Sequence, residues 1–245
     1  MPLPITGQPP SSTVRERLAR EGNPVLIAFS RGKDSIAAWL ACREAGIPTY
    51  AFHWEGVPGM RFVDESIAYF EDVFQTKIHR YPHPSFYRQL RNYVFQPPER
   101  YEVIEAMNLP RWDVHTMERR IRKDLGLPDG TWVVDGNRAS DTMARRTNIT
   151  KQGYLRSSTG KASLIGDWRV SEVRAYIAHH GVELPIDYDI WGRSFDGIGY
   201  HYLAPLRDHL PDDFERVLDW FPLADLELMR HEGLGEHSLN GRAIA

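Results

Sequence analysis

The sequence predicts an α/β protein in which a parallel β-sheet carries helices on both faces, followed by a mostly helical C-terminal region. Short apolar runs such as residues 25–29 and 131–136 lack polar alternation, as expected for strands covered on both faces. Segments with helical periodicity separate these runs, and this alternation favours right-handed crossovers between parallel strands. With 245 residues, 42% of them hydrophobic, the chain can bury one good-sized core and a small second subdomain.

Strands and helices are expected to alternate from residue 25 onward. The predicted strands are residues 25–29, 47–54, 77–81 and 131–136. The first helix presents Ile36, Trp39 and Leu40 on one face, and Gly46 follows its end as a C-cap. Asp64 is expected to cap the second helix. A short helix is predicted in DTMARRTNI, after the fourth strand.

The chain is expected to have three parts. Residues 1–13 are rich in Pro, Ser and Gly and are predicted to form a flexible tail. Residues 14–165 would form the α/β domain, with a helical insert at about 85–125. Residues 166–245 have helical periodicity and would form the C-terminal region.

A basic helix is predicted at residues 117–123 of the insert. Its cationic side chains are Arg119, Arg120, Arg122 and Lys123. Two interpretations stay open: a patch for phosphate or for a protein partner, and a solvated helix face.

Charge and hydropathy argue against nucleic acid or a membrane as a general partner. The formal net charge is -3 and the isoelectric point is near 6.4. No apolar run approaches the roughly 18 residues that span a bilayer, and the first 22 residues lack the apolar core of a secretory signal. We therefore expect a cytoplasmic protein without membrane contact.

Cys42 is the only cysteine of the chain. One thiol excludes an intrachain disulfide, and it argues against a structural zinc site or an iron–sulfur cluster held by this chain. Cys42 lies in the predicted first helix beside Ala38 and Trp39, where a small buried residue is expected rather than a nucleophile.

The hexapeptide SRGKDS joins the first strand to the first helix and has the features of an anion-binding loop. Backbone N–H groups and the helix dipole favour negative charge at such a place. Ser30 and Ser35 offer hydroxyl donors, Gly32 allows close approach to the backbone, and Lys33 adds positive charge. Asp34 would repel a phosphate unless it binds a bridging Mg²⁺ or hydrogen-bonds the loop.

The hexapeptide matches neither G-x-x-x-x-G-K-[ST] nor G-x-G-x-x-G. It resembles the S-G-G-x-D-S pyrophosphate loop of the N-type ATP pyrophosphatases, also called PP-loop proteins or adenine nucleotide alpha hydrolases. The stretches FHWEGVPGMRFVDESIAYFEDVF, DGNRASDTMARR and IGDWRVSEVRAYIAHHGVELPIDYD are similar, in the same order, to segments of the phosphoadenosine phosphosulfate reductase family within that superfamily. The resemblance spans roughly residues 25–190 and implies a Rossmann-like (HUP) sheet.

The resemblance implies an ATP- and Mg²⁺-dependent enzyme. An acceptor would attack the α-phosphate of ATP, pyrophosphate would leave, and the acceptor would be adenylated. The implied catalytic residues are Lys33, Asp34, Arg138 and Arg145, with Asp34 as the residue nearest to the metal. The implied nucleotide-binding residues are Ser30, Arg31, Gly32, Lys33, Ser35, Phe52, His53, Gly136 and Asp141, with the adenine read by backbone around Phe52 and His53.

This sequence departs from the family pattern at two places. Arg31 replaces the first glycine of the loop, where it would add a donor or point to solvent. The reductases proper use a cysteine of a C-terminal E-C-G-[IL]-H motif, and this chain has no cysteine after Cys42. The resemblance therefore carries over nucleotide binding and argues against self-contained sulfonucleotide reduction.

Several alternatives stay open. The chain could be a sulfonucleotide reductase relative that borrows a thiol, or a nucleotide-binding regulatory subunit without turnover. Arg138 and Arg145 could form structural ion pairs with Asp135, Asp141 or Glu172. The acceptor and the oligomeric state are not predicted, although relatives often pair as homodimers.

Overall fold

The computed structural model describes residues 2–240 and contains one six-stranded sheet. The strands are β1 (Val25–Ala28), β2 (Thr49–Glu55), β3 (Ile78–Pro82), β4 (Val133–Val134), β5 (Leu155–Arg156) and β6 (Lys161–Ala162). They lie in the order β3-β2-β1-β4-β6-β5. The pairs β1–β2, β1–β4 and β4–β6 are parallel, and β5 runs antiparallel to β6. The predicted α/β class with a mainly parallel sheet is confirmed.

Helices connect and cover these strands. Those that lie before β4 are α1 (Ser11–Glu21), α2 (Lys33–Glu44), α3 (Arg61–Phe74), α4 (Pro84–Arg91), the 3-10 helix η1 (Pro98–Arg100), α5 (Tyr101–Ala106) and α6 (Val114–Asp124). Those that follow are α7 (Met143–Gln152), α8 (Val170–His179), α9 (Asp187–Trp191), α10 (Tyr200–His209), α11 (Pro211–Trp220) and α12 (Asp225–Asn240). No helix within residues 2–240 combines the length and the apolar character needed to cross a membrane.

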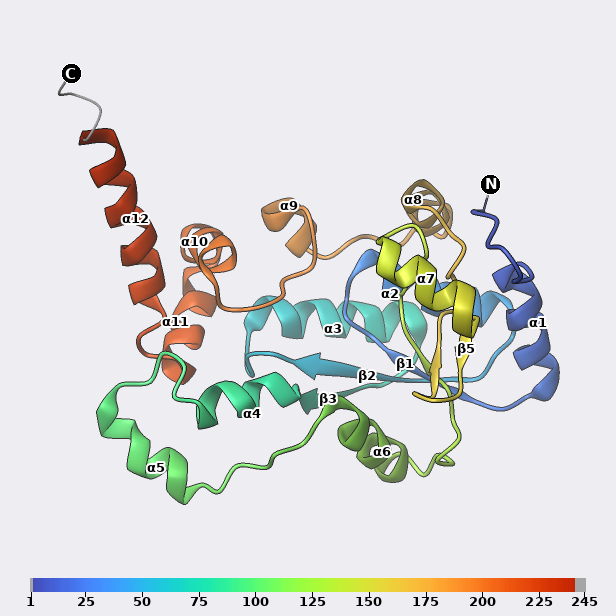
Figure 1. Cartoon of the computed structure of the whole chain (residues 1–245), viewed down its shortest axis with the longest axis horizontal. Helices are drawn as coiled ribbons and strands as arrows, with labels where there is room; N and C mark the ends of the chain where they lie inside the picture. The colour runs from blue at the N-terminus through green and yellow to red at the C-terminus, as the bar shows by residue number, and fades with distance from the viewer. Residues whose placement is uncertain (1, 241–245) are drawn as a thin grey trace. The chain divides into compact units, whose positions relative to one another are not determined.

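Alternate residues of the central strands face two different helical layers. On one face, Leu26, Phe52 and Val133 form a cluster with Ile121 of α6. On the other face, Phe29 packs edge-on against Trp39 of α2 and Phe70 of α3, with ring centroids 5.2 and 5.0 Å apart. Figure 1 shows α6 on one side of the strands and α2 with α3 on the other. The sheet is thus covered on both faces, as its continuous apolar strands require.

The end of α2 has the predicted glycine cap. Gly46 has φ +75°, and the N–H of Ile47 donates to the Cys42 carbonyl at 2.9 Å, as in a Schellman motif. Cys42 is fully buried, and burial raises the pKa of its thiol to about 12. The expectation of a buried structural cysteine is therefore confirmed.

Asp64 does not cap α3, which begins three residues earlier at Arg61. Asp64 lies in the first turn, and Asp213 of α11 takes the capping role instead. The carboxylate of Asp213 accepts the N–H groups of Arg61 and Phe62, the latter at 3.2 Å. A cap supplied from a distant part of the chain leaves no local sequence signal.

The N-terminal segment, expected as a flexible tail, makes specific contacts. The N–H of Leu3 donates to the Asp167 carbonyl at 2.6 Å, and Ile5 is buried in a cluster with Ala139 and Ile149. Ser11 begins α1, and its backbone N–H donates to the Asp167 carboxylate at 2.9 Å.

The chain divides into two compact units. The first comprises Met1–Trp54, Ile67–Tyr81 and Asp113–Pro185, and the second comprises Glu55–Ser66, Pro82–Trp112 and Ile186–Ala245. The helical segment expected at about 85–125 is divided between them, because α6 packs on the sheet of the first unit.

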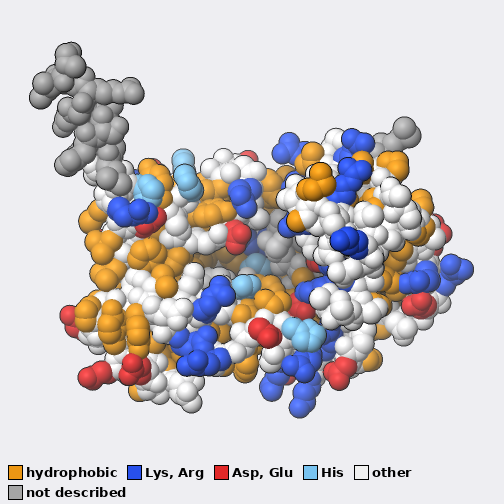
Figure 2. All heavy atoms as spheres, in the orientation of Figure 1, with side chains coloured by type: hydrophobic (Ala, Val, Ile, Leu, Met, Phe, Trp, Pro, Cys, Tyr) orange, Lys and Arg blue, Asp and Glu red, His pale blue; other side chains and the backbone are white. Residues whose placement is uncertain are grey.

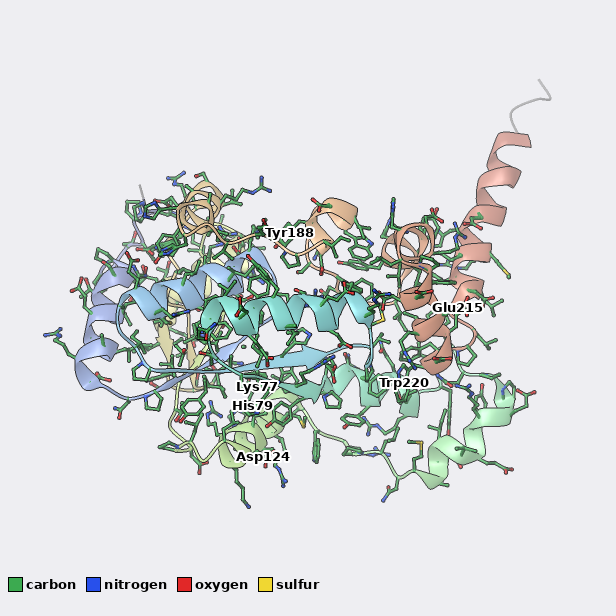
Figure 3. The ribbon with its side chains drawn as sticks, turned by 180° about the vertical axis from the view of Figure 1, so that it is seen from behind. Lys77, His79, Asp124, Tyr188, Glu215 and Trp220 are labelled. Atoms are coloured by element: carbon green, nitrogen blue, oxygen red, sulfur yellow. The ribbon has the colours of Figure 1, made fainter. Side chains whose placement is uncertain are left out.

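The second unit has its own aromatic contacts around Trp220 of α11. Trp220, labelled in Figure 3, packs edge-on against Phe86 with centroids 5.0 Å apart. Its indole N–H donates to the Pro58 carbonyl at 3.0 Å. These contacts join three segments of the second unit that lie far apart in the sequence.

Candidate functional site

The SRGKDS loop lies at the carboxyl end of β1 and turns directly into α2, which begins at Lys33. The two serines hold the loop in shape. The Ser35 hydroxyl donates to the Gly32 carbonyl at 2.8 Å and accepts the Ser30 N–H at 3.3 Å. The Ser30 hydroxyl accepts the Gly32 N–H at 3.3 Å. The loop is therefore folded by its own side chains, and its first helical turn presents the positive end of the α2 dipole.

Arg31 adopts a conformation that usually belongs to glycine. Its φ is +62°. This left-handed conformation costs a residue with a side chain roughly 1–2 kcal/mol of conformational energy. Only 2% of Arg31 is exposed, so the side chain does not point to solvent. This burial excludes the interpretation in which Arg31 points to solvent.

Gly136 follows β4 and lies directly against the start of α2. A Cβ atom placed on Gly136 would lie 2.8 Å from the Asp34 Cβ and 3.0 Å from the Ser35 nitrogen. Real Cβ atoms essentially never approach so closely. Glycine is therefore required here because the backbone after β4 supports the loop after β1.

Five side chains of alternating charge lie around the start of α2. We call this series the charge chain; its members are Lys33, Asp34, Arg138, Asp141 and Arg145. Lys33 Nζ lies 3.0 Å from Asp34 Oδ2, and Arg138 Nε lies 2.9 Å from Asp34 Oδ1. Arg138 also pairs with Asp141 through Nη2, and Arg145 Nη1 lies 2.6 Å from the same carboxylate. The charge chain joins the loop after β1 to the segment after β4.

Arg138 and Arg145 have different surroundings. The Arg138 side chain is only 3% exposed, and its Nη1 donates to the Ser140 hydroxyl at 3.0 Å and to the Trp168 carbonyl at 3.4 Å. The Arg145 side chain is 47% exposed. Arg138 is thus placed to hold the two aspartates, whereas Arg145 can reach a ligand by leaving a single carboxylate.

Asp135 does not pair with either of these arginines. Its carboxylate binds Arg156 and accepts the Ser163 hydroxyl at 2.7 Å and the Asn137 amide at 2.7 Å. Glu172 accepts the N–H of Arg169 at 2.8 Å. Asp135 and Asn137 are thus joined across Gly136, and Asp135 also holds Arg156 and Ser163 in place.

Phe52 lies in the core, and His53 lies at the edge of the loop. Phe52 is fully buried, and its carbonyl accepts the Phe29 N–H at 2.8 Å. His53 Nδ1 lies 2.8 Å from the Phe29 carbonyl, which can only accept, so Nδ1 carries the proton. Burial and then the nearby Arg31 lower the pKa of His53 to about 3. The imidazole is neutral at physiological pH, with Nε2 as an acceptor.

Metal ligands are sparse in this site. Among residues that the structure describes, no group of three or more His, Cys, Asp or Glu side chains could enclose an ion. Asp34 provides one carboxylate, and it faces Lys33 and Arg138. A Mg²⁺ ion at Asp34 would therefore take most of its ligands from phosphate oxygens and water.

Replacing Gly136 with alanine tests the contact between the two loops. We expect Gly136→Ala to lower the free energy of unfolding by about 1–3 kcal/mol, because the added methyl group overlaps Asp34. Gly130→Ala is the matched control, since a Cβ there meets nothing within 4 Å. Urea denaturation of both variants makes the comparison, and equal stability of the two would contradict the contact.

The buried neutral His53 makes stability depend on pH. Its folded pKa lies below the unfolded value of 6.5, so the unfolded chain binds more protons between about pH 6.5 and 3. The free energy of unfolding should therefore decrease as the pH is lowered from about 6.5 to 3, and His53 should contribute up to about 1.4 kcal/mol per pH unit to this slope. His53→Asn keeps an N–H donor for Phe29 and removes the titration. Urea midpoints at pH 4 to 7 should be less pH-dependent in the variant, and an unchanged slope would refute this role.

Comparison with solved structures finds distant structural similarity, whereas the comparisons of sequence find no match. No family model matches the chain, and no curated protein matches it either. Among solved structures, an NH3-dependent NAD synthetase from Campylobacter jejuni subsp. jejuni NCTC 11168, in complex with the nitrate ion, aligns with a TM-score of 0.45. It is 12% identical, and the alignment covers 92% of this chain and 93% of that one.

Proposed function

We propose that this protein binds ATP at the SRGKDS loop and transfers AMP to an acceptor with release of pyrophosphate. The observation that carries the proposal is the loop itself, a serine-braced turn between a buried strand and a helix N-terminus with the charge chain beside it. Its N–H groups and dipole favour an anion. The ordered resemblance to the N-type ATP pyrophosphatases gives the anion its identity as the triphosphate of ATP.

The loop would hold the β and γ phosphates. The N–H of Ile36 donates to the Gly32 carbonyl at 3.1 Å at the start of α2, so the N–H groups of the helix's first turn face the loop. Lys33, with 20% of its side chain exposed, lies beside them and would move from Asp34 to a phosphate oxygen. The pyrophosphate leaving group would thus form against donors that are already in place.

Arg138 would act as a positioning residue and Arg145 as a catalytic one. Arg138 is buried and neutralises Asp34, so that this carboxylate can face a magnesium–phosphate complex. Arg145 is half-exposed and would turn from Asp141 to the α-phosphate, where a guanidinium binds two oxygens at once. The acceptor's nucleophilic atom would form a bond to the α-phosphorus and give up its proton to solvent. The bond from that phosphorus to the bridging oxygen would break.

The burial of Cys42, the only thiol in the sequence, argues against a reductase that works without a partner. Cys42 is fully buried in α2, and burial raises its pKa to about 12, so no thiolate is available. A reductase relative would need a thiol from another protein. It would also prefer phosphoadenosine phosphosulfate to ATP, which a binding measurement can distinguish.

Lys33→Ala tests the binding step by isothermal titration with ATP and Mg²⁺. Losing a charge-assisted hydrogen bond should weaken ATP binding about 10- to 100-fold. Lys77→Ala is the matched control, because Lys77 is 73% exposed and pairs with Glu71 on the surface. Equal affinities of the two variants would contradict the assignment of the loop.

Product analysis by phosphorus NMR then separates the three functions. Release of pyrophosphate together with an adenylated acceptor supports the proposed reaction, and release of inorganic phosphate contradicts it. Preference for phosphoadenosine phosphosulfate supports the reductase alternative. ATP binding without turnover, across a panel of acceptors, supports the regulatory alternative.

A further inference from the structure

Helix α6 has two faces with opposite character. Residues that pack toward the sheet are Met117, Glu118, Ile121 and Arg122, each at most 2% exposed. The outward residues Thr116, Arg119, Arg120 and Lys123 follow the spacing of a single helix face. Figure 2 shows Lys and Arg side chains gathered over α6 along the lower edge of the view.

The outward face lines an open pocket of about 540 Å³. Its lining residues are Thr116, Arg119, Arg120, Lys123, Leu127 and Asp129. Three cationic side chains meet one carboxylate there, so the pocket carries a net charge of +2 in a chain whose formal net charge is -3. The positive charge is therefore local, and overall composition does not explain it.

Two of these cations are weakly engaged by the protein. Among the described residues, Arg119 donates one side-chain hydrogen bond, a long one of 3.4 Å from Nη2 to the Thr116 hydroxyl. Lys123 forms no ion pair in the described part of the chain. Arg120 pairs with Asp124 at 2.8 Å, an exposed contact that water screens and that stabilises little. These donors can therefore turn to an anion at small cost.

Buried contacts on the other face fix the rotation of α6. Arg122 Nε donates to the Thr131 carbonyl at 2.9 Å, and Glu118 pairs with Lys161 of β6. With the helix held from beneath, the cationic face keeps its direction in the absence of a ligand. Pre-organisation of this kind lowers the cost of binding.

The pocket lies away from the SRGKDS loop. Residues 125–130 lead from α6 into the amino end of β4, whereas Gly136 and Arg138, which contact the loop, follow its carboxyl end. The pocket is thus a separate place within the first unit, and it does not depend on the proposed function of the loop.

We propose that this pocket is a second anion site, which binds the phosphate group of a small phosphorylated molecule. Guanidinium groups bind phosphate oxygens in pairs, and Lys123 and the Thr116 hydroxyl add further donors. The volume falls within the range of small-molecule sites, and Leu127 provides an apolar wall for the organic part of the ligand.

Titration with inorganic pyrophosphate tests this site in four proteins: the wild type, Lys33→Ala, Arg119→Gln/Lys123→Gln, and the combination. The pocket predicts that Lys33→Ala still binds pyrophosphate, and that the added double substitution weakens this binding at least about tenfold. Binding should also weaken as salt is raised. If the loop binds no phosphate, Lys33→Ala leaves pyrophosphate binding unchanged, whereas Arg119→Gln/Lys123→Gln still weakens it. The experiment therefore distinguishes failure of the loop proposal from failure of the pocket proposal.

Arg43→Gln/Arg174→Gln is the control for net charge, since it removes two exposed arginines of α2 and α8, which pack together on the sheet face opposite α6. It should leave pyrophosphate binding unchanged. Equal binding by the Arg119→Gln/Lys123→Gln protein and this control would overturn the proposal. So would binding of an RNA oligonucleotide to this face without binding of pyrophosphate, because the face would then serve a macromolecule.

Discussion

The close approach of Gly136 to the first turn of α2 is the contact on which the candidate site depends. It places the segment after β4 against the loop after β1, because these strands are neighbours in the sheet. Parallel neighbours end at the same edge, and at this edge no side chain fits between the two backbones. Arg138, two residues beyond Gly136, thereby reaches Asp34. A larger residue at 136 would separate the two halves of the site.

The charge chain follows from that contact and explains how the loop can hold an aspartate beside the proposed anion site. Arg138 is almost fully buried and lies within ion-pair distance of both Asp34 and Asp141. Buried ion pairs contribute little net stability, because desolvation offsets much of their attraction. Their value here is geometric: Asp34 stays in place and nearly neutralised. Lys33 and Arg145 form the two ends of the series, where a ligand can compete for them.

Sequence reasoning anticipated those features that local pattern encodes. The apolar strand at residues 25–29, the glycine after α2 and the strand-to-helix turn at SRGKDS each follow from a pattern in consecutive residues. The strands β5 and β6 have two residues each, too few for any periodicity, and Asp213 caps α3 from far along the chain. The burial of Arg138 depends on contacts with Asp34, Asp141 and Trp168 that only the folded sheet creates. Spacing alone could not distinguish a positioning arginine from a catalytic one.

A crystal structure with Mg²⁺ and α,β-methylene ATP, which cannot be cleaved at the α–β bond, tests the central claim most directly. The account predicts the β and γ phosphates against the N–H groups at the start of α2, with Lys33 turned toward them and Arg138 still on Asp34. Phosphates bound elsewhere, with Lys33 still on Asp34, would contradict it.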